Sequence, residues 1–272
     1  MENNKTINYT FHKGFSYCEG VVYVKEVGQL ITKTTQSGFD VKELYVDVLY
    51  ADKFHSENYR PTPASAKLKF TGKQAEQASK EIQVGHFLNF YGSVLANDFN
   101  NEHTNHIFNT FMYLIYHYQI LNKYVSEVIA YHIADAYKAV QGTFIFVNAS
   151  VELLTDEIRT EKNFVYCKVA IPLKDNQKKF LTLIKTLKVR HPAMMDGAVP
   201  PIYESPYLNK KGSRAFVKFV PLVQKNLSKD EKTTYYQVYG SYEELSMVEE
   251  PQEKPTETKP KHESSFEFVE EK

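Results

Sequence analysis

The segment 70–94 constrains the fold of this chain more than any other part of the sequence. It reads FTGKQAEQASKEIQVGHFLNFYGSV and predicts the end of one strand, a helix over about 73–82 that stops near Gly85, and a strand over 87–95. The aromatic residues, which make up 14% of the chain and are all Tyr or Phe, are typical of a strand-rich fold. The segment therefore indicates a strand–helix–strand unit within a mainly β chain.

Alternating apolar and polar residues predict further strands before this unit. The segment ELYVDVLY, over 43–50, places three apolar residues on one face and Tyr45 and Asp47 on the other. The remaining elements expected upstream are a strand over 20–31, a turn over 35–40, a polar loop over 51–65 and a strand over 66–70.

The segment 108–121 is compatible with a strand or a helix, and its Phe, Tyr, Ile and Thr content favours a strand. We expect a polar loop over 96–106 before it. The resulting order is strand, strand, loop, strand, helix, strand, loop, strand. This is the order of a five-stranded Greek-key OB barrel with one capping helix, although other small barrels can be drawn from the same order.

Residues 126–248 are expected to form a helix followed by a second β-rich domain. The helix covers 126–140, where Ser126 can cap and apolar residues share one face. A proline-rich loop is expected over 189–213. The expected strands are 143–154, 163–171, 178–187, 214–220 and 233–242. Their alternation leaves open whether this region is a second OB-like barrel or an oligomerisation domain.

Charge is unevenly distributed along the chain, whose net charge is zero. Residues 249–272 contain eight Glu and four Lys, a net charge of −4, so residues 1–248 carry +4. The acidic tail is also rich in proline, and we expect it to be disordered. Residues 1–14 are polar and are expected to be flexible.

No signal for secretion or membrane insertion is visible in the sequence. The N-terminal residues lack the apolar run of a signal peptide. The most apolar stretch, 107–121, is too short and too polar to span a bilayer. Cys18 and Cys167 are far apart and predict no disulfide framework. These features predict a reducing, cytoplasmic location and no membrane partner.

Small residues in the opening segment recur at a spacing that resembles a known signature. GKQAEQAS, over 72–79, is followed by Gly85 thirteen residues after its glycine, and by Gly92 seven residues later. The pattern resembles the core signature of the bacterial and phage single-stranded-DNA-binding protein family over about residues 15–121. The resemblance implies an OB-fold nucleic-acid-binding domain over 15–125, in which the alanines let the helix sit close beneath the barrel and Gly92 relieves crowding.

The resemblance implies that the DNA contacts lie mostly outside this scaffold. Lysines near the third expected strand would follow the DNA backbone, and aromatic rings would stack on bases. The expected DNA-binding residues are Tyr23, Tyr45, Lys67, Lys69, Lys73, Tyr91 and Phe99. The chain departs from the family where the family has aromatic or basic residues, at Ser65, Thr71, Leu95, Ala96 and Asn97.

The family also ends in a disordered acidic segment whose apolar tip docks partner proteins. The tip SSFEFVEE, over 264–271, is similar in character but not in sequence. Phe266, Phe268 and Val269 are the expected contacts with replication or recombination proteins. The alternative is a solvated tail that aids solubility.

Motifs of common enzyme active sites are absent from the sequence, which has no Walker loop, GxGxxG, HExxH or GxSxG. His103 and His106 form an HxxH pair, but no acidic or cysteine partner is spaced to complete a metal site. Asp156, Glu157 and Glu161 are interpreted as a turn. We therefore expect no catalytic activity, no metal and no cofactor.

These observations predict sequence-nonspecific binding of single-stranded DNA in the replication, recombination or DNA transfer of a phage or mobile element. A homo-oligomer is compatible with them. An alternative is an OB-fold structural or protein-interaction module without DNA binding, which the departures at positions 65, 71 and 95–97 favour. An RNA-binding protein is a third interpretation.

Overall fold

The computed structural model describes most of two strand-rich regions of the chain. The described residues are 16–52, 62–121, 140, 142–154, 159–161, 164–171, 184–190 and 210–249. Within them, one helix accompanies a sheet of 12 strands. The fold is therefore mainly β, as the alternation in the sequence predicts. Among these residues, no helix combines the length and the hydropathy that a membrane crossing needs.

Five strands of the N-terminal region close into a barrel. The strands are β1 (Ser16–Val27), β3 (Asp40–Asp52), β4 (Thr62–Thr71), β5 (Phe87–Asn101) and β6 (His106–Leu121). They pair in the ring order β1-β3-β4-β6-β5-β1, and β4–β6 is the parallel pair. A short strand, β2 (Ile31–Thr34), pairs with the start of β3. This is the Greek-key order of the OB fold, which confirms the predicted fold class.

Five strands of the C-terminal region repeat the same order. They are β7 (Phe144–Leu153), β9 (Phe164–Ala170), β10 (Ile184–Arg190), β11 (Arg214–Leu227) and β12 (Thr234–Glu249), with the short β8 (Arg159–Glu161) beside β9. The ring order is β7-β9-β10-β12-β11-β7, and the third and fifth strands are again parallel. Of the two alternatives left open by the sequence, the topology is that of a second OB-like barrel.

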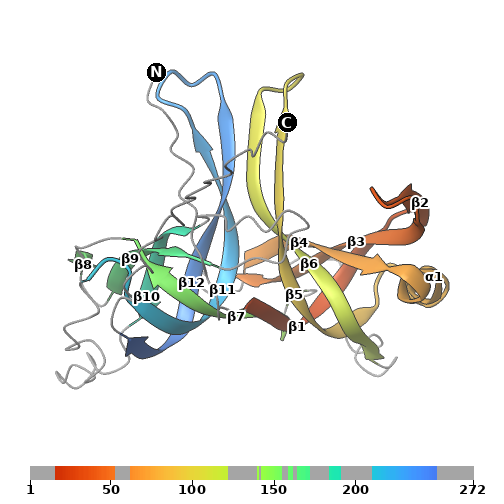
Figure 1. Ribbon diagram of the computed structural model, residues 1–272, viewed down its shortest axis with the longest axis horizontal. Helices are drawn as coiled ribbons and strands as arrows, with labels where there is room; N and C mark the ends of the chain where they lie inside the picture. Colours follow the sequence, from red (N-terminus) through yellow and green to blue (C-terminus); the bar gives the residue numbers. More distant parts are fainter. Residues whose placement is uncertain are drawn as a thin grey trace, which may run out of the picture.

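The first strands of the two barrels pair with each other. β1 and β7 are antiparallel, in a register that runs from Ser16 opposite Ala149 to Val21 opposite Phe144. The long hairpins β5–β6 and β11–β12 rise from the same side of the two barrels (Figure 1). We call these hairpins the arms. β6 and β12 pair in parallel near the ends of the arms, so the barrels are joined at two places.

The alternation of apolar and polar residues along the strands determines which side chains form the core. Leu44, Val46 and Val48 of β3 are fully buried, as the pattern of β3 predicts, and lie in one apolar cluster with residues of the second barrel. The hydroxyl of Tyr50 is buried and donates a hydrogen bond to the carbonyl oxygen of Pro221 in β11. The two barrels therefore share a continuous core.

Helix α1 (Gly72–Glu81) lies between β4 and β5, where the sequence predicts it. Gly72 starts the helix with a φ of 61°, a conformation that glycine adopts at low cost. Ala75 and Ala78 are fully buried, so their small side chains allow the helix to pack closely against β3 and β4. These residues are scaffold, as the resemblance implies.

Several predicted boundaries are wrong. The segment 96–106, predicted as a polar loop, is mostly strand, because its Asn-rich residues pair with β6 from Ala96 opposite Phe111 to Asn101 opposite His106. The other differences are a β1 that ends at 27, a β3 that extends to 52, a β4 that begins at 62, a β10 that runs to 190, and strands β11 and β12 that extend to 227 and 249. Residues 178–183 of the strand predicted over 178–187 lie outside the described residues.

Other predicted elements lie outside the described residues. The helix predicted over 126–140 falls almost entirely within 122–139, and most of the loop predicted over 189–213 falls within 191–209. The flexible start over 1–14 and the tail beyond 249 also lie outside. The domain boundary predicted between 125 and 126 stays a prediction.

Candidate nucleic-acid interface

OB barrels bind oligonucleotides on the face of their second and third strands and on the loops between strands one and two and between strands four and five. In the first barrel these parts are β3 and β4, the connection that contains β2, and the β5–β6 arm. We call the outward residues of β3 and β4 the β3–β4 face. The side chains of β9 and β10 lie largely outside the described residues, so the site is built from the first barrel.

The β3–β4 face pairs lysines with carboxylates. The strand register places Tyr45 opposite Lys69 and Asp47 opposite Lys67. Lys69 Nζ lies 2.6 Å from Glu43 Oε1, and Lys67 Nζ lies 2.6 Å from Asp47 Oδ1. The structure therefore brings Tyr45, Lys67 and Lys69 to one face, but each of the two lysines already holds an acidic partner.

Glu43 is the largely buried centre of a charge network. Its side chain is 10% exposed, accepts a hydrogen bond from the Tyr45 hydroxyl at 2.6 Å, and pairs with Lys33 at 3.0 Å as well as with Lys69. Burial alone would raise the pKa of Glu43, but hydrogen bonds from Lys69, Tyr45 and Lys33 outweigh it and lower the pKa from 4.5 to about 2. Glu43 is therefore ionised at neutral pH and offsets the charge of Lys69.

The two lysines of the face differ in their availability to DNA. The Lys69 side chain is 17% exposed and is held by Glu43. The Lys67 side chain is 39% exposed, and its partner Asp47 is 38% exposed. A solvent-exposed ion pair contributes little and is easily exchanged for a phosphate partner, whereas a buried one is not. Lys67 is thus the better candidate for a phosphate contact, and Lys69 serves mainly to neutralise Glu43.

The connection before β3 carries exposed residues that the sequence reading missed. Phe39 is 72% exposed at the end of a turn in which its N–H donates to Thr35 Oγ1 at 3.0 Å. Lys33 in β2 lies with Nζ 5.4 Å from the centre of the Tyr45 ring. The signal for Phe39 is visible in TQSGFD, where one aromatic ring interrupts a polar turn. Lys33 becomes recognisable only through the pairing of β2 with β3.

The predicted contact Phe99 lies on the β5–β6 arm, near the end of β5. Its side chain is 48% exposed, and its ring is stacked on Phe108 of β6 with the centroids 4.2 Å apart. This arm is the connection between strands four and five, one of the regions through which OB barrels hold oligonucleotides. Phe99 therefore presents an aromatic ring where the fold favours a base contact.

The other two predicted tyrosines are placed differently. The β1–β3 register sets Tyr23 opposite Leu49, beside the β3–β4 face, and its ring packs edge to face on Phe87 at 5.4 Å. Tyr91 is 45% exposed in β5 and packs between Tyr17 of β1 and Tyr116 of β6, with centroids 5.7 and 6.3 Å away. Tyr91 belongs to a face formed by β1, β5 and β6, away from the β3–β4 face.

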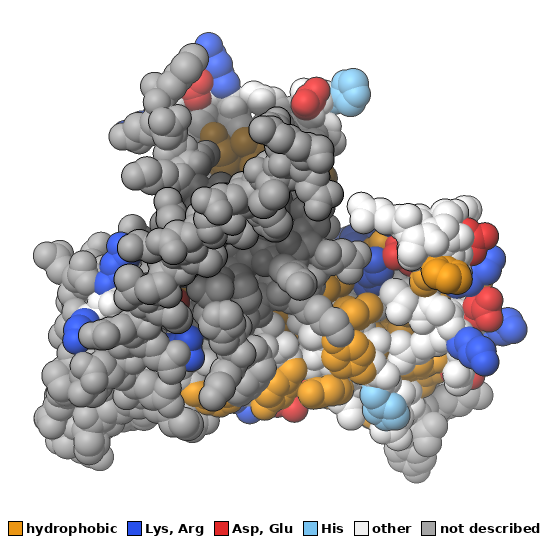
Figure 2. Space-filling model, viewed as in Figure 1, with side chains coloured by type: hydrophobic (Ala, Val, Ile, Leu, Met, Phe, Trp, Pro, Cys, Tyr) orange, Lys and Arg blue, Asp and Glu red, His pale blue; other side chains and the backbone are white. Residues whose placement is uncertain are grey.

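Lys73 is exposed in the first turn of α1 and makes no ion pair with a described residue. On the flank of the first barrel that carries β2 and α1, basic and acidic side chains alternate (Figure 2). This flank is not a uniformly basic surface, which agrees with the ion pairs of Lys33, Lys67 and Lys69. A phosphate backbone would therefore meet a few separated cations.

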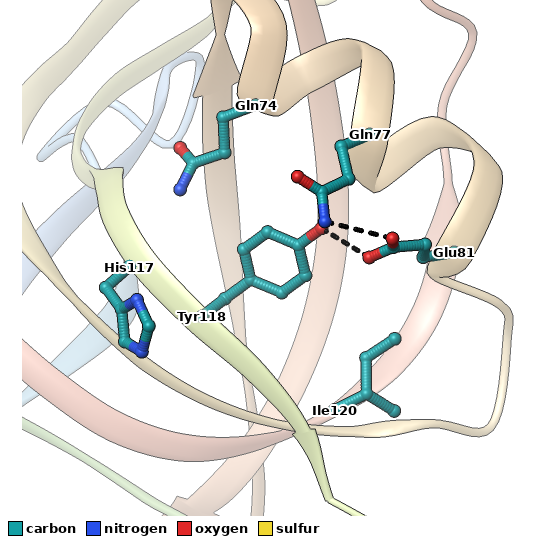
Figure 3. Close-up of a pocket in the computed structure, with 6 residues that line it drawn as sticks. All are labelled: Gln74, Gln77, Glu81, His117, Tyr118 and Ile120. Carbon is teal, nitrogen blue, oxygen red and sulfur yellow. Dashed lines mark hydrogen bonds between the residues drawn. The ribbon is translucent and has the colours of Figure 1, made fainter.

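A polar pocket of about 380 Å³ lies between α1 and β6 (Figure 3). The Glu81 carboxylate accepts hydrogen bonds from Gln77 Nε2 at 2.9 Å and from the Tyr118 hydroxyl at 3.0 Å. Burial, together with the hydrogen bond to Glu81 and its charge, raises the pKa of Tyr118 to about 12. The remaining lining residues are Gln74, His117 and Ile120. The negative charge of Glu81 disfavours a phosphate here, so this pocket is not part of the candidate interface.

The predicted tail contacts Phe266, Phe268 and Val269 lie outside the described residues. Among the described residues, no group of three or more His, Cys, Asp or Glu side chains could hold a metal ion. Cys18 is a buried free thiol whose pKa is raised by burial and by Glu19, so it is unreactive at neutral pH.

No protein-family model and no curated protein sequence matches this chain. Solved structures do match its fold. The wild-type single-stranded DNA binding protein from Thermus aquaticus gives a TM-score of 0.52 at 13% identity, covering 89% of this chain and 95% of that chain. A deletion mutant of the same protein gives a TM-score of 0.53 at 12% identity, covering 90% of this chain and 99% of that chain. The similarity extends over both barrels and confirms, at the level of the fold, the resemblance found in the sequence.

Proposed function

We propose that this chain binds single-stranded DNA without sequence preference. The observation that carries the proposal is the presentation of aromatic rings and lysines on the parts of an OB barrel that hold oligonucleotides. Phe39 and Tyr45 lie at or next to the β3–β4 face, Phe99 lies on the arm, and Lys67 provides an accessible cation. Every base has a flat apolar face, so such rings tolerate any sequence.

The structure of the interface favours stacking over charge. Glu43 and Asp47 neutralise much of the positive charge of the β3–β4 face. Stacking contributes about 1–3 kcal/mol for each base, so two or three rings suffice for useful affinity even with few phosphate contacts. The second barrel adds a linked copy of the same fold, and two sites in one chain bind one strand more tightly than either site alone.

One specific observation supports the alternative function, a protein-interaction module without DNA binding. Lys67 and Lys69, the two lysines expected to follow the DNA backbone, each already pair with a carboxylate. Lysines that are already paired offer less positive charge to a phosphate backbone. RNA is a further candidate ligand, because stacking on exposed rings does not distinguish the two nucleic acids.

The biological setting belongs to the same proposal. Four further points stay predictions. They are a role in replication, recombination or DNA transfer of a phage or mobile element, a cytoplasmic location, self-association, and the docking of partners through the acidic tail. The similarity to the Thermus aquaticus protein supports a DNA-binding role, since that protein is described as binding single-stranded DNA.

A salt titration tests the proposal. We expect a labelled oligo(dT) to bind the full chain at low salt, measured by fluorescence anisotropy. Each phosphate contact contributes about −0.7 to the slope of log affinity against log salt. With few accessible lysines, we expect a shallow slope of about −1.5 to −3. The absence of binding at low salt would contradict the proposal, whereas a steep slope would contradict the dominance of stacking.

A further inference from the structure

The two arms form one continuous sheet. β6 and β12 pair in parallel from His106 opposite Thr234 to Asn109 opposite Gln237. The tips are joined as well: the Thr234 N–H donates to the Asn105 carbonyl oxygen at 3.1 Å, and the Asn105 side-chain amide donates to the Lys232 carbonyl oxygen. The hairpins of both barrels thus support each other.

Aromatic rings run across this joined sheet in a row. The registers set Phe99 opposite Phe108, and Phe108 opposite Tyr236. Phe99 and Phe108 are stacked at 4.2 Å with 13° between their planes, and Phe108 and Tyr236 at 4.5 Å with 4°. His106 packs edge to face against Tyr236 at 5.6 Å. We call Phe99, Phe108 and Tyr236 the ring ladder, and it crosses from the first barrel to the second.

The ring ladder has an open end at Phe99. One face of this ring is covered by Phe108, while the side chain as a whole is 48% exposed. At the other end, Tyr236 is half-buried and faces Lys225 of β11 across the strand register. Nucleobases stack on the flat faces of aromatic side chains. A base placed on Phe99 would extend a stack that already exists.

We propose that a nucleobase of single-stranded DNA stacks on the open face of Phe99, and that Tyr236 of the second barrel is the positioning residue that holds this site in place. The inference rests on the proposed function and deepens it. Tyr236 does not touch the base. It fixes Phe108, which fixes Phe99, so the ring is ordered before the base arrives. Base binding on the arm of the first barrel therefore depends on the second barrel.

Pre-ordering explains why Tyr236 matters to affinity. An isolated hairpin side chain loses rotamer freedom when a base immobilises it, which weakens binding. In the ring ladder this freedom is already lost on folding, because each ring is held by its neighbour and the arms are joined through β6 and β12. Removing Tyr236 restores part of that freedom without removing any group that contacts DNA.

The absence of Trp from the sequence makes the site directly observable. In the full chain, Phe99→Trp introduces a single Trp at the open end of the ring ladder. We expect oligo(dT) to quench its fluorescence strongly. An abasic oligonucleotide of the same length, which offers phosphates without bases, should bind more weakly and leave the fluorescence nearly unchanged.

Tyr236→Leu then tests the positioning role. In the Phe99→Trp background, we expect it to lower affinity for oligo(dT) by about three- to tenfold and to leave affinity for the abasic oligonucleotide unchanged. Tyr236→Phe keeps the ring and should retain full affinity. Tyr235→Leu is the matched control, since Tyr235 is the next residue of β12 and points to the opposite face of the strand. Thermal unfolding verifies that each variant is folded.

The outcomes separate this inference from the proposed function. If oligo(dT) binds but the Trp is not quenched, or if Tyr236→Leu weakens oligo(dT) and abasic binding equally, the inference is wrong and the proposed function stands. If Tyr235→Leu has the same effect as Tyr236→Leu, the role of Tyr236 is general stability and the inference is wrong. If oligo(dT) does not bind the unaltered chain, the proposed function itself fails.

Discussion

Gly92→Ala is expected to lower the free energy of unfolding by about 3 kcal/mol or more. A Cβ at position 92 would lie 2.1 Å from the carbonyl oxygen of Leu114 and 3.2 Å from the Cα of Ile115. These are backbone atoms of β6, and they are held by the β5–β6 ladder at a point where its register shifts. The added methyl group therefore cannot be accommodated by a side-chain rotation, and the two strands must separate.

Gly38→Ala is the matched control for this prediction. Gly38 has a φ of 83°, so alanine is strained there, but no heavy atom lies within 4 Å of the new Cβ. We expect a loss of about 1 kcal/mol from the strained backbone alone. Urea denaturation of both variants measures the difference. Equal losses would show that the close approach of β5 and β6 at Gly92 is not a determinant of the fold.

Lys69→Glu is expected to destabilise the chain by about 3 kcal/mol. The substitution places a second carboxylate beside Glu43, whose side chain is 10% exposed and whose pKa is held near 2 in part by Lys69 itself. Lys33 would remain as the single lysine within ion-pair distance of Glu43 among the described residues. Two partly buried carboxylates then repel each other at neutral pH, and urea denaturation should report the loss.

Lys67→Glu, two residues earlier on the same strand, is the control. Lys67 and Asp47 are both more than a third exposed, so we expect a change in unfolding free energy of no more than about 1 kcal/mol. The affinity for oligo(dT) should nevertheless fall several-fold, because an accessible cation becomes an anion. If Lys67→Glu destabilises the chain as much as Lys69→Glu, our distinction between the two ion pairs is wrong.

Local patterns in the sequence predict the strands and the helix of the first barrel, and the resemblance around α1 selects the OB fold among the small barrels that share this order. The spacing of small residues around α1 predicts the helix and its close packing, because alanine side chains at 75 and 78 are small enough to be buried against the barrel. The alternation in β3 likewise predicts its buried face. The order of the strands in the second half also matches an OB barrel, although alternation by itself leaves that choice open.

Features that depend on pairing between distant strands could not be predicted in this way. Asn97, Asn100 and Asn101 have low strand propensity, yet they lie in β5 because the arm pairs along its whole length. The pairing of Lys67 with Asp47 requires the register of β3 and β4. Tyr236 is 137 positions from Phe99 in sequence, and only the joining of the arms places both in one ring ladder.

A competition experiment tests the central claim, nonspecific binding of single-stranded DNA, most directly. Complexes of the full chain with labelled oligo(dT) at low salt are challenged with unlabelled oligo(dT), mixed-sequence single-stranded DNA, the corresponding duplex and RNA of the same sequence. We predict that the two single-stranded DNAs displace the label about equally and that the duplex is at least about tenfold weaker, because its bases are not free to stack. Displacement by the duplex at the same concentration as by single-stranded DNA, or the absence of any complex, would contradict the account.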